Sequence, residues 1–371
     1  MKTRIAILIL SIFCFSTCVD PIEFDTSSEP ARLVVEGFIS DLSAAERSDP
    51  YAIESYFKVK LSISSPVSNQ RDEVVSGATV KIVDDSGGEI ILQEFSESGE
   101  YYIIDQHFKA QESREYKLQI ITNDGKTYES LPERVHKAKS QDWPYYELDE
   151  KLIIQDIGGK KEPNLIKGIN VFTNLPDNET TETAYYRWDI IPTWVYIAPL
   201  PSDNSPLKTC WVTNDYYFKD IVLHEDNLGK GNYPKQLFFL PVTGNDKLKH
   251  DFSVLIRQFS LSEKAYDFWE SLKKQRESVG SIFDPPPFTI KGNIINVNDP
   301  DDRVLGYFSV ASESEKRWFV NIHELPYTLE ESNPCDPPPG VPNIPTPDCL
   351  SCFEYGGGST SITNQKPPWW R

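Results

Sequence analysis

The chain has 371 residues, a formal net charge of -19 and 12% aromatic residues. A surface this acidic repels nucleic acid and anionic lipid head groups, because phosphate contacts need clustered lysine and arginine. The length suits about two domains, and the abundance of aromatic and β-branched residues predicts a mainly β protein.

Residues 1–17 have the pattern of a secretory signal peptide. Lys2 and Arg4 precede an apolar run of eleven residues and two small polar residues. This run is well short of the roughly 20 residues that a membrane helix needs, so we expect the segment to be removed. Small residues ending at Cys18 predict lipoprotein processing, in which Cys18 is acylated and becomes the new N-terminus. The alternative is an ordinary cleaved signal followed by an incidental cysteine.

Residues 18–28 are predicted to be a lipidated tether, because they are partly acidic and interrupted by Pro21. Loss of the signal, which holds two basic residues and no acidic one, moves the formal net charge from -19 to -21. Acidic residues soon after the acylated cysteine also resemble the surface-export signal of Bacteroidota lipoproteins. We therefore expect a lipid-anchored protein of the outer membrane, on the cell surface.

Residues 29–135 are predicted to form an immunoglobulin-like β-sandwich. Apolar residues alternate along 57–63, 78–82 and 116–120, and Asp-Ser-Gly-Gly and Asn-Asp-Gly turns occur among these runs. Strands of this length and spacing are typical of a sandwich of about 100 residues. The periodicity breaks near Val135, which sets the predicted boundary.

Residues 136–330 are predicted to form a larger β-rich domain with one helix near 262–279. Ser262 is a suitable N-cap, and the helix has one apolar face: Ala265, Phe268, Trp269 and Leu272. Residues 331–371 are rich in proline, glycine and cysteine and show no periodicity. We predict that this tail is a long loop, packed on the second domain and pinned by disulfides.

Four cysteines remain beyond the signal and the lipidation site: Cys210, Cys335, Cys349 and Cys352. An even number in an exported chain indicates disulfides, and four cysteines allow three pairings that the sequence does not separate. The alternatives are a zinc site or a redox pair at Cys349 and Cys352. Zinc sites of this kind normally bring two close pairs, and a redox motif belongs at a helix start. We therefore predict two structural disulfides.

The sequence offers no recognisable catalytic or cofactor-binding motif. Its five histidines show no metal-ligand spacing: His107, His136, His224, His250 and His323. No Gly-x-Ser-x-Gly elbow or phosphate-binding glycine loop is present either. We predict no enzymatic activity, no cofactor and no metal, and one acidic segment is only a weak calcium candidate: Asn298, Asp299, Asp301 and Asp302. An ordinary acidic turn is the preferred interpretation of that segment.

Dense aromatic clusters are the most suggestive feature for binding. Five residues are candidate contacts for a ligand or partner: Trp143, Tyr145, Trp194, Trp369 and Trp370. Within alternating strands, one ring of each adjacent pair tends to face the core, so Trp188 and Trp211 are predicted core residues. Trp369 and Trp370 either fill a groove on their own domain, which we favour, or meet a partner.

Several stretches together resemble one known family. In order, they are "LVVEGFISD", "GATVKIVDD", "CWVT", "SLSEKAYDFWESL", "FDPPPFTIKGNIINVNDPDDRVLGYFSV" and a terminal "CLSC" with "KPPWW". They are similar to Bacteroidota lipoproteins grouped as domain of unknown function 4249, over nearly the whole mature chain. The resemblance implies a partner of a TonB-dependent outer-membrane transporter and brings no catalytic residues.

The resulting hypothesis is a non-enzymatic accessory protein that binds a ligand or a transporter and helps nutrient uptake. The main alternative is a structural or assembly factor of an outer-membrane complex. An extracellular hydrolase is the second alternative.

Overall fold

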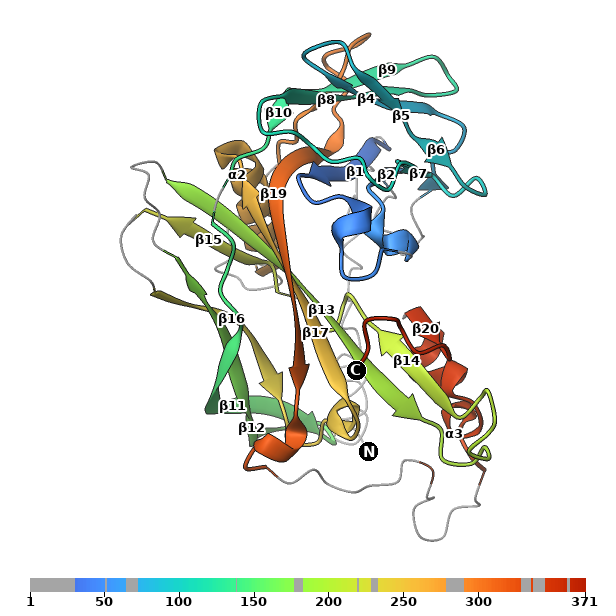
Figure 1. Ribbon diagram of the computed structural model, residues 1–371, viewed down its shortest axis with the longest axis vertical. Coiled ribbons are helices and arrows are strands. Elements are labelled where there is room, and N and C mark those ends of the chain that lie inside the picture. Colours follow the sequence, from blue (N-terminus) through green and yellow to red (C-terminus); the bar gives the residue numbers. More distant parts are fainter. Residues whose placement is uncertain are drawn as a thin grey trace, which may run out of the picture.

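The computed structural model describes residues 31–50, 52–64, 73–137, 139–176, 183–218, 220–227, 233–277, 290–327, 335, 344–358 and 361–371. The predicted signal peptide, Cys18 and the tether lie outside the described residues. The described chain is mainly β, as the composition predicted. It forms two β-sandwiches, the first at the top of Figure 1 and the second below it.

The first sandwich has two facing sheets. One contains β1, β2, β7 and β6, with β3 beside β2, and the other has the order β18-β9-β8-β4-β5, with β10 beside β8. The bounds are β1 (Leu33–Ser40), β2 (Lys58–Ile63), β3 (Glu73–Val74), β4 (Thr79–Asp84), β5 (Glu89–Ile91), β6 (Gln93–Glu94), β7 (Glu100–Tyr102), β8 (Glu115–Ile121), β9 (Thr127–Ser130), β10 (Glu133–Arg134) and β18 (Ile294–Asn296). Short 3₁₀ turns lie at Ala44–Glu46 and Ile53–Ser55.

Alternation along these strands builds the first core. In β8, Tyr116, Leu118 and Ile120 are buried while their neighbours are more exposed, and in β4 the buried residues are Val80 and Ile82. Side chains of successive residues in a strand point to opposite faces, so this pattern aims one apolar row at the facing sheet. The predicted strands at 78–82 and 116–120 therefore have the expected inward faces.

The first sandwich extends beyond the predicted range 29–135, because two late segments complete it. β18 pairs with β9, and the start of β19 (Leu305–Val320) pairs in parallel with β1. Ile294, Phe308 and Val310 belong to the same core as the early strands. Periodicity along a chain identifies strands but does not say which distant strand lies beside them. For this reason the predicted boundary near Val135 does not enclose every strand of the first sandwich.

Close backbone approach holds these late segments in place. At Gly306, φ is +98°, and a Cβ atom would lie 1.9 Å from the carbonyl oxygen of Val35. Glycine alone adopts this conformation readily and leaves room for β1. The Asn293 side chain bonds both backbone groups of Phe308, donating to its carbonyl at 2.8 Å and accepting from its N–H at 2.9 Å. Residues 290–310, which belong to the resembling stretch "FDPPPFTIKGNIINVNDPDDRVLGYFSV", thus close the first sandwich.

The second sandwich packs two sheets around another apolar core. One is the three-stranded sheet β11-β12-β16, and the other contains β20-β14-β13-β17-β19, with β15 beside β13. The bounds are β11 (Tyr145–Ile157), β12 (Lys160–Leu175), β13 (Ala184–Ile197), β14 (Thr209–Thr213), β15 (Val222–Asp226), β16 (Tyr233–Pro241), β17 (Phe252–Leu261) and β20 (Ser361–Thr363). Further 3₁₀ turns lie at Asp246–Leu248, Ile322–Glu324 and Cys352–Gly358.

Strand β19 belongs to both sandwiches. Its first half pairs with β1, and its second half pairs antiparallel with β17, so one sheet continues from the first sandwich into the second. Figure 1 shows this strand running from the lower side of the first sandwich to the lower end of the second. Its 16 residues span about 50 Å at the usual rise of a strand.

Helix α2 (Glu263–Glu277) follows β17 directly, within the predicted range 262–279. The Ser262 hydroxyl accepts a hydrogen bond from the Ala265 N–H at 3.2 Å, which is the expected N-cap contact. Ala265 and Phe268 are buried against Tyr307 of β19. The predicted stop at Gly280 lies outside the described residues.

The described tail has more structure than the predicted loop. It contains a short second helix, α3 (Pro347–Leu350), and strand β20, which pairs with β14 of the second sandwich. Both elements are too short to produce a readable periodicity. Their packing on the second sandwich agrees with the predicted position of the tail.

Candidate functional site

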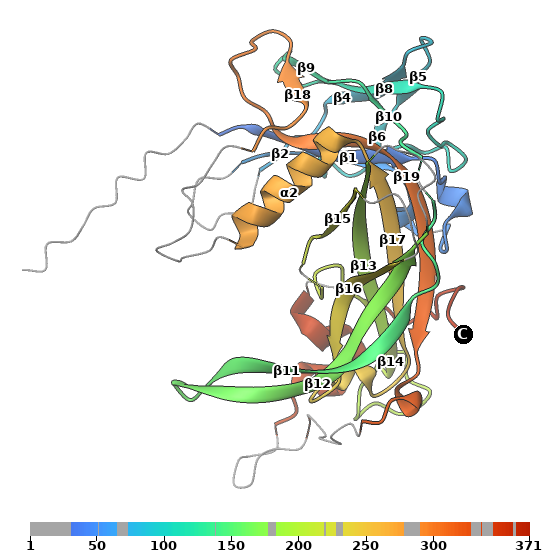
Figure 2. The same ribbon diagram turned by 90° about the vertical axis from the view of Figure 1, so that its left-hand side faces the viewer.

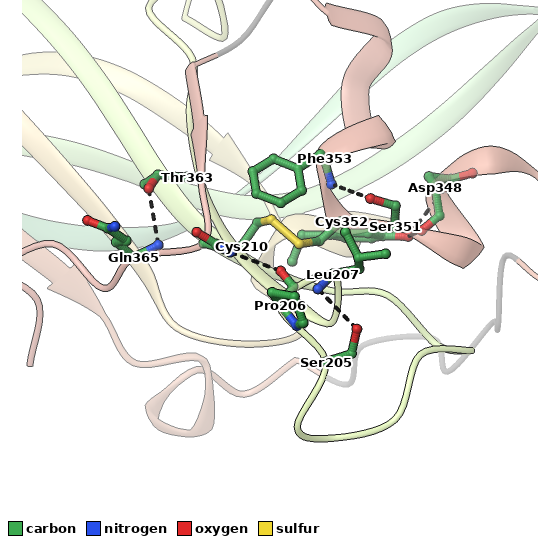
Figure 3. Close-up of a disulfide and its surroundings, with 12 residues drawn as sticks. Ser205, Pro206, Leu207, Cys210, Asp348, Ser351, Cys352, Phe353, Thr363 and Gln365 are labelled. Atoms are coloured by element: carbon green, nitrogen blue, oxygen red, sulfur yellow. Dashed lines mark hydrogen bonds between the residues drawn. A yellow bond between two sulfur atoms is a disulfide. The ribbon is translucent and has the colours of Figure 1, made fainter.

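The four cysteines form two disulfides, Cys210–Cys352, which fastens the tail to the second sandwich, and Cys335–Cys349, which joins two residues within the tail. The first joins β14 to the turn after α3, and Figure 3 shows it beside Leu207 and Phe353. The Cys352 N–H also donates to the Leu207 carbonyl at 2.8 Å. With all four cysteines bonded to one another, neither the zinc site nor the Cys349–Cys352 redox pair is present.

Trp194 is a core residue, so its assignment as a ligand contact was wrong. Its side chain is 1% exposed and stacks on Phe252 in the second sandwich. Inward alternation along β13 buries it, as it buries Trp188. The clustering of aromatic residues in the sequence did not indicate which of them lie on the buried face of β13 and which on the exposed face.

Trp143 and Tyr145 lie at the start of β11. Trp143 is 63% exposed, with the Lys316 ammonium 5.2 Å from its ring centroid. Tyr145 stacks on Phe172 and donates to the Asn174 side chain at 3.2 Å. Of the two, Trp143 is the more exposed to solvent.

Trp369 and Trp370 pack on their own chain. The Trp369 indole N–H donates to Asp49 at 3.0 Å, and the Arg317 guanidinium lies 3.3 Å from its ring centroid. Trp370 is buried against Trp211 and Phe319. The end of the chain therefore fastens a loop of the first sandwich to the second.

A buried charge cluster lies under this loop. The Arg47 guanidinium bonds Glu313 at 2.7 Å, and the exposed fractions of the two side chains are 1% and 0%. In the same cluster, Arg257 Nε lies 2.8 Å from a Glu315 carboxylate oxygen. Burial lowers the pKa of Arg317 to about 10, so this side chain stays cationic at neutral pH. We call these five residues the junction cluster: Arg47, Arg257, Glu313, Glu315 and Arg317.

The sequence contained a signal for the junction cluster that was missed. Glu313, Glu315 and Arg317 occupy alternate positions of β19, so they share one face. Charges at alternate positions of a strand normally indicate a solvated face. Here the loop containing Arg47 and Asp49 covers that face, together with Trp369.

A second buried polar contact joins the two sandwiches. Glu133 of β10 accepts hydrogen bonds from the hydroxyls of Tyr307 and Ser262. Burial raises the pKa of Glu133, although both hydroxyl donors favour its ionised form. This carboxylate therefore ties β10 to β19 and to the start of α2.

The calcium candidate is an acidic turn whose side chains bond other residues of the turn and Thr127 of β9. The Asn298 side chain accepts from the Thr127 N–H at 2.7 Å, and Asp302 accepts from the Asn296 amide at 2.8 Å. Asp299 and Asp301 are exposed, and Asp299 accepts from the Asp301 N–H. Across the described ranges, no group of three or more metal-ligating side chains converges.

The five histidines lie in separate places. His107, His250 and His323 are exposed. His136 is half-buried and lies in the segment that connects the strands of the first sandwich to those of the second along the chain. His224 is half-buried, with its Nε2 atom 2.6 Å from the Tyr233 hydroxyl, and burial lowers its pKa. None of them lies in a metal-binding group within the described chain.

A surface hollow of about 730 Å³ lies at the edge of the first sandwich and includes His107 in its lining. Its carboxylates already have partners in the chain. Asp84 accepts from Ser86 and Gly88, Asp41 accepts from Ser312 and Glu313, and Glu112 pairs with Lys137. These groups hold turns and strand ends and do not converge on a common point.

The hairpin of β11 and β12 extends beyond the sandwich, a feature that the sequence analysis missed. β12 pairs with β16 only from Gly168 onward, so the outer part of the hairpin pairs only with itself among the described residues. Figure 2 shows it reaching outward from the body of the molecule. We call residues 148–166 the arm. The Gly158-Gly159 turn after the apolar run at 152–154 was an available hairpin signal.

The arm carries exposed apolar side chains: Leu148, Leu152, Ile153, Ile154 and Leu165. Leu152 is 70% exposed and Ile154 is 73% exposed. Strand alternation and the pairing of Leu152 with Leu165 place all of these except Ile153 on one face. That face continues the buried row of Ile169 and Val171, so the core surface of the sheet extends outward beyond the core.

No helix within the described residues is long and apolar enough to cross a membrane. A family model described as "Domain of unknown function (DUF4249)" matches residues 19–317. No curated protein and no solved structure matches the chain.

Proposed function

The chain belongs to the family described as domain of unknown function 4249, as its sequence predicted, and from this premise we propose a function in outer-membrane transport. The protein acts as a lipid-anchored, non-enzymatic accessory of a TonB-dependent transporter, on the cell surface. It docks on the transporter and helps it take up its ligand. The anchor is the acyl group at Cys18.

The observation that carries this proposal is the arm. Contiguous apolar side chains on a soluble surface mark interaction sites, because their hydration is unfavourable and the fold gains nothing from exposing them. Leu152 and Ile154 lie on a hairpin far from either core, where their exposure serves no packing role. A protein partner at this surface removes that unfavourable exposure.

Two features support docking over catalysis. The most buried ionic groups, Arg47 and Glu313, pair with each other, and the carboxylates around the surface hollow hold turns. A hydrolase needs acid and base groups that converge on a substrate position. These carboxylates are instead engaged in contacts within the chain, which makes an extracellular hydrolase the weaker alternative.

Co-purification tests this function. We would isolate the native lipidated protein from detergent-solubilised outer membranes and identify its companions by mass spectrometry. The expected result is a TonB-dependent transporter in near-equal amount. Isolation of the protein alone would contradict the proposal. Recovery of a different outer-membrane protein would instead support the structural or assembly role.

A variant with Leu152→Asp and Ile154→Asp is the matched test of the arm. Both residues are exposed, so charged replacements leave the core intact while they disrupt apolar docking. We expect the variant to reach the membrane in normal amount and to lose the transporter. A variant at exposed Ile91 of the first sandwich, Ile91→Asp, is the control and should retain it.

A further inference from the structure

The outer edge of β11 is open along its whole length in the described structure. β11 has 13 residues and pairs with β12 alone, and the register runs without a bulge from Tyr145 opposite Phe172 to Ile157 opposite Lys160. Soluble proteins usually protect such an edge with proline, a bulge, charged side chains or a covering segment, and of these β11 has only the charged side chains among the described residues. β11 contains no proline, and no other described strand covers it.

Hydrogen bonds near the base of the arm show which backbone groups face outward. The Glu150 N–H donates to the Asp149 side chain at 2.9 Å, so it is turned away from β12. Lys167 lies opposite Glu150, and its backbone groups bond residues after β16: its carbonyl accepts from Val242 at 2.8 Å. The backbone groups of alternate residues in an antiparallel strand point the same way. Leu148, Glu150, Leu152 and Ile154 therefore direct theirs outward.

The charged side chains of β11 indicate which residues a strand paired with its outer edge would carry. Among its residues are four carboxylates and one ammonium group: Glu147, Asp149, Glu150, Asp156 and Lys151. Glu150 has a lysine neighbour, Lys167, at 3.7 Å, but both side chains are about half exposed and such a contact is weak. Cross-strand neighbours of opposite charge stabilise a sheet, and like charges destabilise it.

We propose that the outer edge of β11 binds an extended segment of a partner protein by strand addition. The segment alternates apolar residues, which lie beside Leu148, Leu152 and Ile154, with basic residues, which lie on the opposite face beside Glu147 and Asp149. Its backbone pairs with the outward groups of β11 and adds a fourth strand to the sheet β11-β12-β16. This inference rests on the proposed function and names the binding mode of the arm.

Two other occupants fit less well. A second copy would bring its own acidic β11 to the same edge, in a chain whose formal net charge is already -19. An anionic lipid surface would face the same carboxylates. Both therefore meet charge repulsion that a basic strand avoids.

The test uses purified full-length protein and synthetic peptides of twelve residues. The first peptide alternates valine with lysine, the second has glutamate in place of lysine, and the third is the lysine peptide N-methylated at alternate residues. N-methylation removes hydrogen-bond donors and leaves the side chains unchanged. We expect the lysine peptide to bind at least tenfold more tightly than either of the others, measured by calorimetry.

Variants of β11 separate pairing from apolar contact. Leu152→Pro with Ile154→Pro removes two outward N–H groups, and proline is tolerated where a strand N–H faces solvent. The matched Leu152→Ala with Ile154→Ala keeps both N–H groups and loses similar apolar surface. We expect the proline variant to bind the lysine peptide at least tenfold more weakly than the native protein. The alanine variant should lose less affinity for this peptide than the proline variant does.

The inference is overturned by no binding of the lysine peptide, by equal binding of the glutamate peptide or of the N-methylated peptide, or by equal losses in the two variants. The N-methylated peptide keeps the test valid even if proline disturbs the hairpin. Concentration-dependent dimerisation that only the proline variant abolishes would instead assign the edge to a second copy. Binding to phosphatidylglycerol vesicles with no peptide binding would assign it to lipid.

Co-purification with the proline variant separates this inference from the proposed function. If the transporter accompanies the native protein and the proline variant equally, strand addition is wrong and the accessory function stands. If the native protein binds the lysine peptide through its backbone but recovers no transporter, the accessory function is wrong and the β11 site stands.

Discussion

The junction cluster and the arm reverse the usual distribution of side chains. At the junction, Arg47 and Glu313 are charged and fully buried, whereas on the arm Leu152 and Ile154 are apolar and largely exposed. Buried charges are tolerated because they pair with each other, and their pairing fixes one sandwich against the other. Exposed leucine and isoleucine gain nothing from the fold. The comparison teaches that buried charges serve the fold at the junction, whereas exposed apolar side chains on the arm support the proposed binding role.

Breaking the buried ion pair is expected to have the largest effect. Glu313→Leu leaves Arg47 and Arg257 buried without one of their carboxylates, so the free energy of unfolding should fall by about 3–5 kcal/mol. Urea denaturation followed by tryptophan fluorescence measures this change. The double variant Arg47→Met with Glu313→Leu removes both charges and should recover most of the loss. Equal instability of the two variants would contradict a structural role based on charge pairing.

Trp370→Ala tests the second contact at the junction. It removes a buried ring from between Trp211 and Phe319, which should lower the free energy of unfolding by about 3 kcal/mol. The control is Trp143→Ala, because this tryptophan is exposed and its loss should change stability by less than about 0.5 kcal/mol. Similar values for the two variants would argue against the C-terminus as a fastening.

The pH dependence of stability reports on Glu133. Burial raises the pKa of this carboxyl above its ordinary value of 4.5, so the folded state binds the proton more tightly than the unfolded state. This contribution is fully present below pH 4.5 and is lost as pH rises through the raised pKa. Glu133→Gln should therefore remove one component of the decline in urea midpoint as pH rises from 4.5 to 8. Parallel pH profiles of the variant and native protein would show that Glu133 does not titrate as expected.

The smallest stability effect is expected on the arm. Leu152→Ser with Ile154→Ser replaces exposed side chains, so the free energy of unfolding should change by less than about 0.5 kcal/mol. Urea denaturation measures this change. Binding of the dye ANS should fall, because the variant exposes less apolar surface. A large loss of stability would show that these residues serve the fold and would remove the contrast with the junction.

Local patterns predicted much of the architecture. Alternation located the inward faces of β4 and β8, and the N-cap at Ser262 with its apolar face located α2. The even number of cysteines predicted two disulfides, although their pairing required the structure. These features depend on residues close together in sequence, and this is why they were readable.

Features built from distant residues escaped prediction. Arg47 and Glu313 are 266 positions apart in the sequence, and the residues around each of them do not predict the contact. Trp194 was predicted to contact a ligand because many aromatic residues surround it in the sequence. The sequence did not show that its side chain lies on the buried face of β13. The free edge of β11 is a property of the sheet order, which depends on β16 as well as on the hairpin.

The shared strand β19 imposes an order on folding. Parallel pairing joins β1 near the start of the chain to residues 305–311, so the first sandwich lacks a strand until most of the polypeptide has been synthesised. Contacts this remote in sequence form slowly, because a long loop must close first. The early strands therefore remain without this partner strand until β19 has been synthesised, and the first sandwich completes its fold only then.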